Sequence, residues 1–190
     1  MKFNKNIWLA FLLQGVCLFS QNEGCGVYLS AADFQKKLAT HCSENTKLKH
    51  HEVFKRNIIQ VITHDSTYTY EKKDLFGYRD ADGSTYRYYK GKAYLIVNPF
   101  ETILFYKMPD GPAIKGQTQT YSYYFSKDAG SPMMDLTLGN VENAFKEDKL
   151  FSQLIEIHFN NDDELLEYDN VHGMFKLNRL LQLAKDGKLN

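Results

Sequence analysis

The chain has 190 residues, 23 basic and 23 acidic side chains, and an aromatic content of 14%. This length is enough for one well-filled core rather than two. The balanced charge excludes the strongly basic surfaces with which proteins bind nucleic acid or anionic membranes.

The first residues have the layout of a secretory signal peptide. Lys2 and Lys5 precede an apolar run over 7–19, and Ser20 is a small residue at a possible cleavage point. The run is shorter than the ~20 residues of a membrane-spanning helix. We therefore expect residues 1–20 to be removed, with no transmembrane segment left. Residues 21–190 would then form a single domain, exported to the periplasm, the cell surface or the exterior.

Two cysteines, Cys25 and Cys42, remain after that cleavage. An even number in an oxidising compartment favours a disulfide, here worth about 3 kcal/mol from loop entropy. Neither cysteine belongs to a CxxC pair or a catalytic signature, so a reactive thiol lacks support. The sequence therefore predicts a Cys25–Cys42 disulfide.

The first predicted element of the mature chain is a short helix within residues 30–42. Ser30 is followed three residues later by Asp33, which is the spacing of a capping box. Phe34 and Leu38 would share one face of this helix.

The β-rich part spans residues 53–128. Short segments rich in β-branched and aromatic residues alternate there with turn signals, which is typical of strands. The predicted strands are 58–63, 66–71, 75–80, 85–90, 93–98, 102–108 and 119–126. Connections this short favour antiparallel neighbours. We expect an antiparallel meander that is strongly twisted or barrel-like.

The pattern becomes helical over residues 139–187. Asn140 and Asn161 are predicted helix caps, and Gly187 is a predicted terminator. Leu177 and Leu181 lie on one stripe of the last helix. These helices are apolar on one side only, so they should pack on the sheet, which gives an α+β fold.

The stretch "FGYRDADGSTYRYY" (76–89) is predicted to be a hairpin. With Asp82-Gly83 as a two-residue turn, Arg79 would oppose Tyr86 and Tyr78 would oppose Arg87. Each face would then carry an arginine beside a tyrosine, which stabilises the hairpin without a ligand. The alternative is that Arg79 or Arg87 grips a carboxylate or sulfate. A longer turn would shift this pairing by one residue.

Metal and catalytic motifs give little support to either kind of site. The histidines at 41, 50, 51 and 64 lack the paired spacing of a zinc site, and "DADG" (80–83) lacks the rest of a calcium loop. No nucleophile elbow, zinc-protease helix or phosphate-binding glycine loop is present. We therefore predict no metal, no cofactor and no catalytic residue.

Tyrosine is the remaining feature, with eleven of the thirteen lying between positions 68 and 124. Tyrosine suits half-buried strands, with its ring inside and its hydroxyl in water, and this is the ordinary interpretation. The alternative is an exposed aromatic platform for a ligand or partner, since a sheet with tyrosines on both faces cannot bury them all. The candidate ligand contacts are Tyr78, Arg79, Arg87, Tyr121 and Tyr123.

These observations favour a non-catalytic binding or interaction module. Its partner would be an envelope protein, a glycan or a small apolar ligand. The alternative is a secreted hydrolase whose acidic residues come together only in the fold. A third possibility, a purely structural envelope component, predicts neither an aromatic patch nor a pocket.

Three segments carry a resemblance: "GVYLSAADFQ", "KKDLFGYRDADGSTYRYY" and "FKLNRLL". With them, nearly all of the mature chain resembles a group of uncharacterised secreted proteins of the Bacteroidota. The resemblance implies a bacterial cell-envelope setting. The group has no established activity, so the resemblance implies no catalytic residue.

Overall fold

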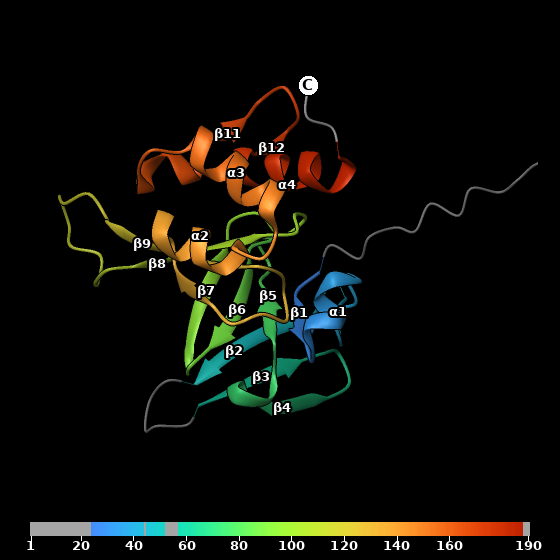
Figure 1. Ribbon diagram of the computed structural model, residues 1–190. Helices are drawn as coiled ribbons and strands as arrows, with labels where there is room; N and C mark the ends of the chain where they lie inside the picture. The colour runs from blue at the N-terminus through green and yellow to red at the C-terminus, as the bar shows by residue number, and fades with distance from the viewer. Residues whose placement is uncertain (1–23, 44, 52–56, 188–190) are drawn as a thin grey trace, which may run out of the picture.

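The computed structural model describes residues 24–43, 45–51 and 57–187, so the predicted signal peptide lies outside it. The fold is α+β, as predicted, with antiparallel sheets followed by helices (Figure 1). The larger sheet has the strand order β1-β5-β6-β7-β8-β9-β10 and is open rather than a closed barrel. Its strands are β1 (Gly26–Tyr28), β5 (Gly77–Arg79), β6 (Thr85–Tyr89), β7 (Lys92–Ile96), β8 (Leu104–Pro109), β9 (Tyr121–Ser126) and β10 (Met134–Asp135).

A second sheet takes the order β2-β3-β4, so the expected single meander is divided in two. Its strands are β2 (Lys47–His51), β3 (Ile58–Ile62) and β4 (Thr67–Glu71). The chain leaves this small sheet through a 3-10 turn, η2 (Lys72–Asp74), after which β5 pairs with β1 from the N-terminal end. The small sheet and the helices lie toward opposite ends of the molecule (Figure 1).

The register of the larger sheet sorts its side chains onto two faces. Directly paired positions run across five strands in one row: Tyr78, Tyr86, Leu95, Lys107 and Tyr123. Paired residues point to the same face, so this row defines one face, which we call the helix-side face. Alternate residues along each strand, including Arg87, Tyr94 and Tyr106, lie on the other, α1-side face.

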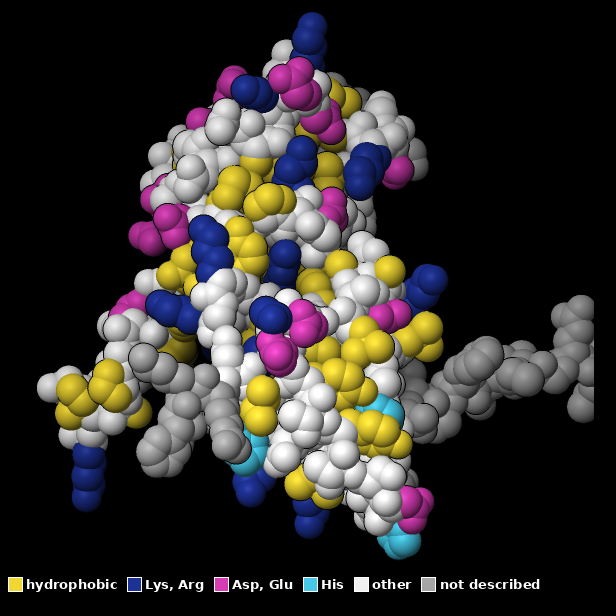
Figure 2. All heavy atoms as spheres, turned by 90° about the horizontal axis from the view of Figure 1, so that it is seen from below, with side chains coloured by type: hydrophobic (Ala, Val, Ile, Leu, Met, Phe, Trp, Pro, Cys, Tyr) yellow, Lys and Arg dark blue, Asp and Glu magenta, His cyan; other side chains and the backbone are white. Residues whose placement is uncertain are grey.

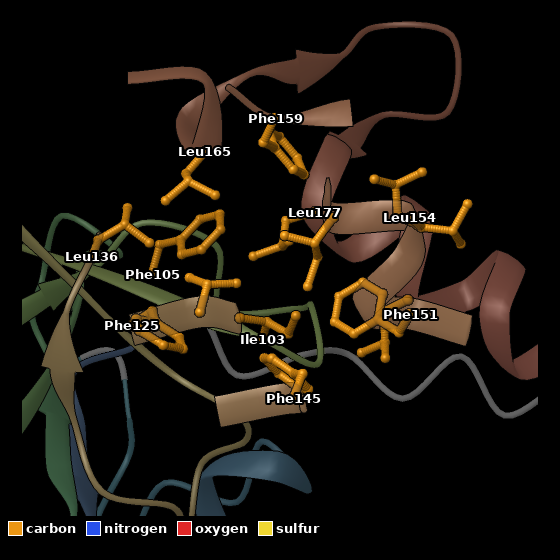
Figure 3. Close-up of a cluster of buried hydrophobic side chains, with 14 residues drawn as sticks. Ile103, Phe105, Phe125, Leu136, Phe145, Phe151, Leu154, Phe159, Leu165 and Leu177 are labelled. Atoms are coloured by element: carbon orange, nitrogen blue, oxygen red, sulfur yellow. The ribbon is translucent and has the colours of Figure 1, made fainter. Parts of the chain in front are cut away.

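The helix-side face of β8 and β9 is covered by α2 (Leu138–Phe145), α3 (Lys149–His158) and α4 (Lys176–Asp186). Each helix is apolar on one side, and these sides meet in a core with the sheet (Figure 3). Fully buried members of this core are Ile103, Phe105, Phe125, Val141, Phe151, Ile155, Leu165 and Leu177. The predicted packing of helices on the sheet is confirmed.

The helix ends correct one prediction and confirm another. α2 is capped by Thr137, whose hydroxyl accepts a hydrogen bond from the Asn140 backbone N–H. Asn140, the predicted cap, lies inside the helix, and its amide donates to the Asp135 carbonyl. α4 ends at Gly187 as predicted, with a φ of 62° that suits glycine.

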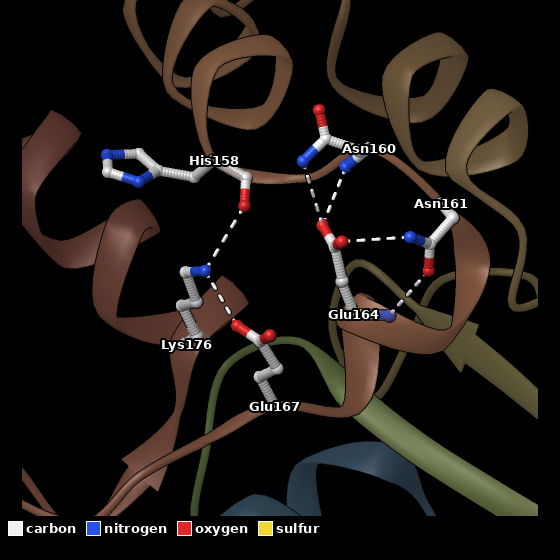
Figure 4. A network of polar contacts seen from close by, with 6 residues as sticks. All are labelled: His158, Asn160, Asn161, Glu164, Glu167 and Lys176. Atoms are coloured by element: carbon white, nitrogen blue, oxygen red, sulfur yellow. Dashed lines mark hydrogen bonds and ion pairs between the residues drawn. The ribbon is translucent and has the colours of Figure 1, made fainter.

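Between α3 and α4 the chain forms η3 (Asp162–Leu166), capped by Asn161 as predicted. The Glu164 carboxylate accepts hydrogen bonds from the Asn160 backbone and side chain and from the Asn161 amide (Figure 4). These bonds, the Asn160 backbone bond first, lower the pKa of Glu164. Lys176 closes the same connection through Glu167 at 2.6 Å and the His158 carbonyl at 3.1 Å.

One hairpin of two two-residue strands completes the helical part: β11 (Tyr168–Asp169) pairs with β12 (Met174–Phe175) just before α4. Within the described part of the chain, no helix has both the length and the apolar character needed to cross a membrane.

The α1-side face is covered by α1 (Ala31–Gln35) and by residues 127–133. The predicted capping box is present: the Ser30 hydroxyl accepts from the Asp33 N–H, and the Asp33 carboxylate accepts from Ser30. α1 is shorter than the predicted helical region, so Leu38 lies beyond its end and is exposed. Phe34 packs here with Tyr94 and Tyr106.

The hairpin of β5 and β6 shows the one-residue shift that a longer turn produces. The Asp80 N–H donates to the Ser84 carbonyl, so three residues form the loop, and Gly83 takes a φ of 86°. Tyr78 therefore opposes Tyr86, and Gly77 opposes Arg87. The predicted pairing of each arginine with a tyrosine is wrong, because the turn is a three-residue type with glycine in the left-handed position.

Candidate functional site

The helix-side face has different covers at its two ends. At β1, β5 and β6 it packs on the small sheet, where Val27 and Tyr78 contact Ile59 and Val61 in one buried cluster. At β8 and β9 it packs on the helices. Between the two covers, a set of side chains remains half-exposed. We call this set the open row; it consists of Tyr86, Leu95, Lys107, Tyr121 and Tyr123.

The open row is rigid at both ends. The Tyr86 ring stacks on the buried Tyr78 ring, with centroids 4.8 Å apart and planes 9° apart. Burial raises the pKa of the Tyr86 hydroxyl, so it stays protonated and can donate a hydrogen bond at neutral pH. At the other end, Lys107 Nζ lies 4.9 Å from the centroid of the Tyr121 ring, and that tyrosine is 41% exposed.

The chemistry of the open row is three phenol rings, one aliphatic side chain and one cation. It contains no carboxylate. Aromatic rings on a sheet offer flat apolar surfaces with polar rims, and the ammonium group adds attraction for an anion. The arrangement can therefore hold a ligand with flat apolar faces and a negative charge.

The structure separates the five residues predicted as ligand contacts. Tyr121 and Tyr123 belong to the open row. Tyr78 is on the same face but only 7% exposed, because the small sheet covers it. Arg79 and Arg87 lie on the α1-side face, so the five do not form one surface.

Arg87 is 6% exposed and its guanidinium is used within the protein. It donates to the Tyr106 hydroxyl at 2.8 Å, to Ser126 Oγ at 3.3 Å and to the Ser131 carbonyl at 2.9 Å. It also lies 5.3 Å from the centroid of the Phe76 ring. Arg87 therefore ties β6 to β8, β9 and the segment that follows β9, which is a structural role.

The sequence did not point to Tyr86, Leu95 or Lys107 as neighbours of Tyr123. The signal that could have found them is the cross-strand register, which links β6, β7, β8 and β9 in one row. That register follows only when the loop lengths are known, and the hairpin shift shows how one residue changes the faces.

A cleft of about 310 Å³ lies between α1 and the connection from β7 to β8. Phe34, Phe100, Glu101, Thr102 and Asp128 are among its lining residues. Burial raises the pKa of Glu101, although hydrogen bonds from Asn98, the Phe175 backbone and Asn178 oppose the shift.

Asp128 has the opposite shift in the same cleft. Burial alone would raise its pKa, but hydrogen bonds from Ser131 and Gly130 and the charge of Arg87 bring it below its ordinary value. Both carboxyl groups line the cleft, and pKa values that move apart are one feature of acid–base pairs in hydrolases. The cleft is therefore the second candidate site.

Cys25 and Cys42 are not joined by a disulfide in this structure. Cys25 Sγ donates to the Thr46 carbonyl at 2.6 Å, and Cys42 Sγ donates to the Gly24 carbonyl at 2.8 Å. The antiparallel bridge between Val27 and Thr40 does not extend to the two cysteines. His41, which separates Thr40 from Cys42, takes a φ of 58° and interrupts the extended backbone. The predicted disulfide is thus absent from this conformation.

The histidines are used in pairs with other side chains. His41 Nε2 lies 2.8 Å from the Tyr70 hydroxyl, and its ring stacks on Tyr68 with centroids 3.6 Å apart. His51 Nε2 lies 2.8 Å from Gln60 Oε1. Among residues 24–43, 45–51 and 57–187, no three His, Cys, Asp or Glu side chains are grouped so as to hold a metal ion.

The fold and the open row define a class: an antiparallel α+β domain with a half-covered aromatic row. No protein-family model, no curated protein and no solved structure matches the chain.

Proposed function

We propose that the protein is an exported, non-catalytic binding module of a bacterial cell envelope, and that the open row binds an acidic glycan. The signal-peptide layout of residues 1–20 supports export, and the resemblance to secreted Bacteroidota proteins supports the envelope setting. Mass spectrometry of the N-terminus of the secreted protein tests export; a chain that still starts at Met1 contradicts it.

The observation that carries the proposed ligand is the composition of the open row. Tyr121 and Tyr123 offer ring faces, and sugar rings have flat C–H faces that pack on such surfaces. Lys107 is the row's single charge, which favours sugars with a carboxylate. The row itself contains no carboxylate; the nearest acids act at its Tyr86 end, where Asp82 and Asp80 add to the raised pKa of that hydroxyl.

Binding can be tested with oligosaccharides that contain uronic acid and with matched neutral oligosaccharides, by isothermal titration calorimetry. Tyr121→Ala should weaken binding of the acidic and the neutral oligosaccharides about tenfold, since the contact of one sugar with one aromatic ring is worth roughly 1–2 kcal/mol. Lys107→Met should weaken only the acidic ligand. Tyr168→Ala is a matched control, because this tyrosine is 50% exposed but lies in β11, away from the row.

Two results would contradict the proposed ligand. One is unchanged affinity in Tyr121→Ala. The other is equal loss for both oligosaccharides in Lys107→Met, which would mean that the lysine contributes packing rather than charge. No binding of any oligosaccharide in a broad array would remove the glycan and leave an envelope protein or a small apolar ligand as the partner to test.

A secreted hydrolase is the second candidate function, and the cleft with Glu101 and Asp128 favours it. In this reading Glu101, with the raised pKa, acts as the general acid, and Asp128, with the lowered pKa, acts as the base or nucleophile. Glu101→Gln should then abolish hydrolysis of chromogenic glycosides while Tyr121→Ala leaves it unchanged. A wild-type protein with no activity on such substrates removes this candidate.

The Cys25–Cys42 disulfide also belongs to the proposed exported state. An oxidising compartment favours the bond, and forming it requires the two thiols to give up their hydrogen bonds to the Thr46 and Gly24 carbonyls. The intact mass of the secreted protein should rise by two hydrogens on reduction if the bond forms. An unchanged mass, with two thiols open to alkylation after unfolding, removes it.

A further inference from the structure

The two main sheets have four edges among the described residues, and three of them are protected. β10 has only two residues, and β1 is bridged to Thr40 by two backbone hydrogen bonds with Val27. β2 carries Lys47 and Lys49, and edge lysines discourage strand pairing. Short strands, covered edges and charge are the devices by which proteins prevent edge-to-edge association.

β4 lacks these protections, apart from the single charge of Glu71 at its end. Its sequence, "TYTYE", contains no proline and no lysine, and its residues are mostly exposed. In the strand order β2-β3-β4 its second side has no strand neighbour. Figure 2 views this end of the molecule from below and shows hydrophobic side chains, tyrosines included in that colour, gathered beside histidines.

The backbone of β4 shows which groups point away from β3. The Thr63 N–H donates to the Ser66 carbonyl, and the Lys72 N–H donates to the Asn57 carbonyl. These two cross-strand pairs are therefore hydrogen-bonded, and between them every second pair of β3 and β4 is hydrogen-bonded as well. Tyr68 and Tyr70 fall on hydrogen-bonded positions opposite Val61 and Ile59. Thr67, Thr69 and Glu71 therefore direct their N–H and C=O groups to the open edge.

We propose that the open edge of β4 pairs with β4 of a second copy of this chain, antiparallel about a two-fold axis at Thr69. In that register Thr69 opposes Thr69, and Thr67 opposes Glu71 of the partner copy. Every outward N–H and C=O of the three residues then has a partner. The two small sheets become one continuous six-stranded sheet.

Charge disfavours an axis at Glu71, and poor overlap of the strands disfavours an axis at Thr67. An axis at Glu71 would place the two Glu71 carboxylates directly opposite each other, which is destabilising. An axis at Thr67 would set β4 against the His64-Asp65 turn and leave Glu71 outside the ladder. The axis at Thr69 instead puts each carboxylate opposite a threonine, and Lys73 already balances Glu71 at 2.7 Å.

The side chains also favour a second copy. With the axis at Thr69, Tyr68 opposes Tyr70 of the partner copy at a non-hydrogen-bonded pair, where side chains approach most closely. Two such aromatic pairs form, one on each side of the axis. His41 holds both rings in place beforehand, through its stack on Tyr68 and its bond to Tyr70. Ordering these rings on association therefore costs little entropy.

The test uses the mature chain and single cysteines on β4. In the proposed register the two Thr69 Cα atoms lie about 5.5 Å apart, within disulfide range. Thr69→Cys should therefore form a covalent dimer on a non-reducing gel under mild oxidation. Thr67→Cys is the matched control: two Thr67 residues would be about 13 Å apart along the strands, too far to bond. The unmodified chain shows any background from Cys25 and Cys42.

Association without a cross-link is measured by sedimentation equilibrium. One short strand pair is a small interface, so we expect a dimer that dissociates in the micromolar range. Thr69→Lys, which sets two lysines opposite each other, should be monomeric, and Thr69→Val should dimerise like the unmodified chain. Circular dichroism confirms that each variant is folded.

A chain that is monomeric up to about 1 mM overturns the proposal. Cross-linking of Thr67→Cys as efficiently as Thr69→Cys overturns the register, and so does a dimer that Thr69→Lys leaves intact. A ligand effect of Tyr121 would survive any of these outcomes, because the open row lies on the other sheet.

Discussion

The two covers of the larger sheet differ in chemistry. Under the helices the buried side chains are almost all phenylalanine, leucine, isoleucine and valine, and the core is closed (Figure 3). Under the small sheet the buried cluster is smaller and includes Tyr78 and Tyr88, with Tyr70 and Tyr86 half-buried around it. A tyrosine keeps its hydroxyl near water or a polar partner, so the cluster under the small sheet is less completely buried than the core under the helices.

This difference predicts that the helical end contributes mainly to stability and the tyrosine-rich part mainly to binding. The helical end supplies most of the fully buried apolar surface, which is the main source of folding free energy. The small-sheet end and the open row keep aromatic groups accessible in fixed positions. We expect core changes under the helices to act on unfolding, and changes in the tyrosine-rich part to act mainly on binding.

The largest expected effect is truncation at the centre of the helical core. Phe151 is fully buried and packs edge-on against Phe145, with centroids 4.9 Å apart. Phe151→Ala should lower the free energy of unfolding by about 3–5 kcal/mol, measured by urea denaturation. Ile157→Ala is the control on the same helix, because Ile157 is 73% exposed; an equal loss there would mean that α3 does not pack as described.

A buried amide joins the helical end to the sheet and should give the next largest effect. Asn178 in α4 accepts from the Ile103 N–H at 2.8 Å and donates to the Ile103 carbonyl at 2.9 Å. Asn178→Ala leaves the buried Ile103 N–H without its side-chain partner, while the Ile103 carbonyl keeps the bond from the Asn98 amide, so stability should fall by about 1–3 kcal/mol. Thermal unfolding checks this. A loss no larger than that of Gln182→Ala on the same helix, whose side chain is exposed, would contradict it.

Glu101 makes a pH prediction of definite sign. Burial raises its pKa above the ordinary value of 4.5, so its ionised form is less stable in the folded than in the unfolded chain. Stability should therefore increase as the pH falls through the folded pKa toward 4.5. Glu101→Gln should remove this part of the pH dependence, measured by denaturant midpoints from pH 7 to 4. A steeper dependence in the variant would show the opposite sign.

Glu164 gives the smallest effect, and its pH dependence of stability has the opposite sign to that of Glu101. Its pKa is lowered by the bonds from Asn160 and Asn161, so its stabilising contribution is present above about pH 4.5 and is lost as the pH falls through the folded pKa. Glu164 is half-exposed and its bonds stay within the 160–164 turn, so the change should be local. Hydrogen exchange should show the Asn160 amide losing protection in acid, and Glu164→Gln should remove that change. Equal acid sensitivity in the variant would contradict it.

Sequence patterns identified most of the helices and strands, but fewer of the pairings between strands. All seven predicted strands are present, because period-two patterns and turn residues act over a few positions. β1, β2, β10, β11 and β12 were missed: β1 has only three residues, β2 consists largely of lysines and histidines, and the other three have two residues each. The split into two sheets depends on the pairing of Gly26 with Arg79, which no local pattern encodes.

The candidate site was predicted in part, for the same reason. Tyr121 and Tyr123 were expected to share an exposed face, and they belong to the open row. Tyr78 and Arg87 were grouped with them, but the small sheet buries one and the segment after β9 engages the other. Burial by segments far away in the sequence decided both outcomes.

The sequence by itself determined where strands, turns and caps lie and that tyrosines concentrate in the sheet. These features depend on backbone sterics and hydrogen bonds between near neighbours, as at Ser30, Asn161 and Gly187. The tertiary structure decided which strand adjoins which, and so which tyrosines remain half-exposed and which edge stays open. Solvent exposure is set by what packs over a residue, and here the covering segments come from remote parts of the chain.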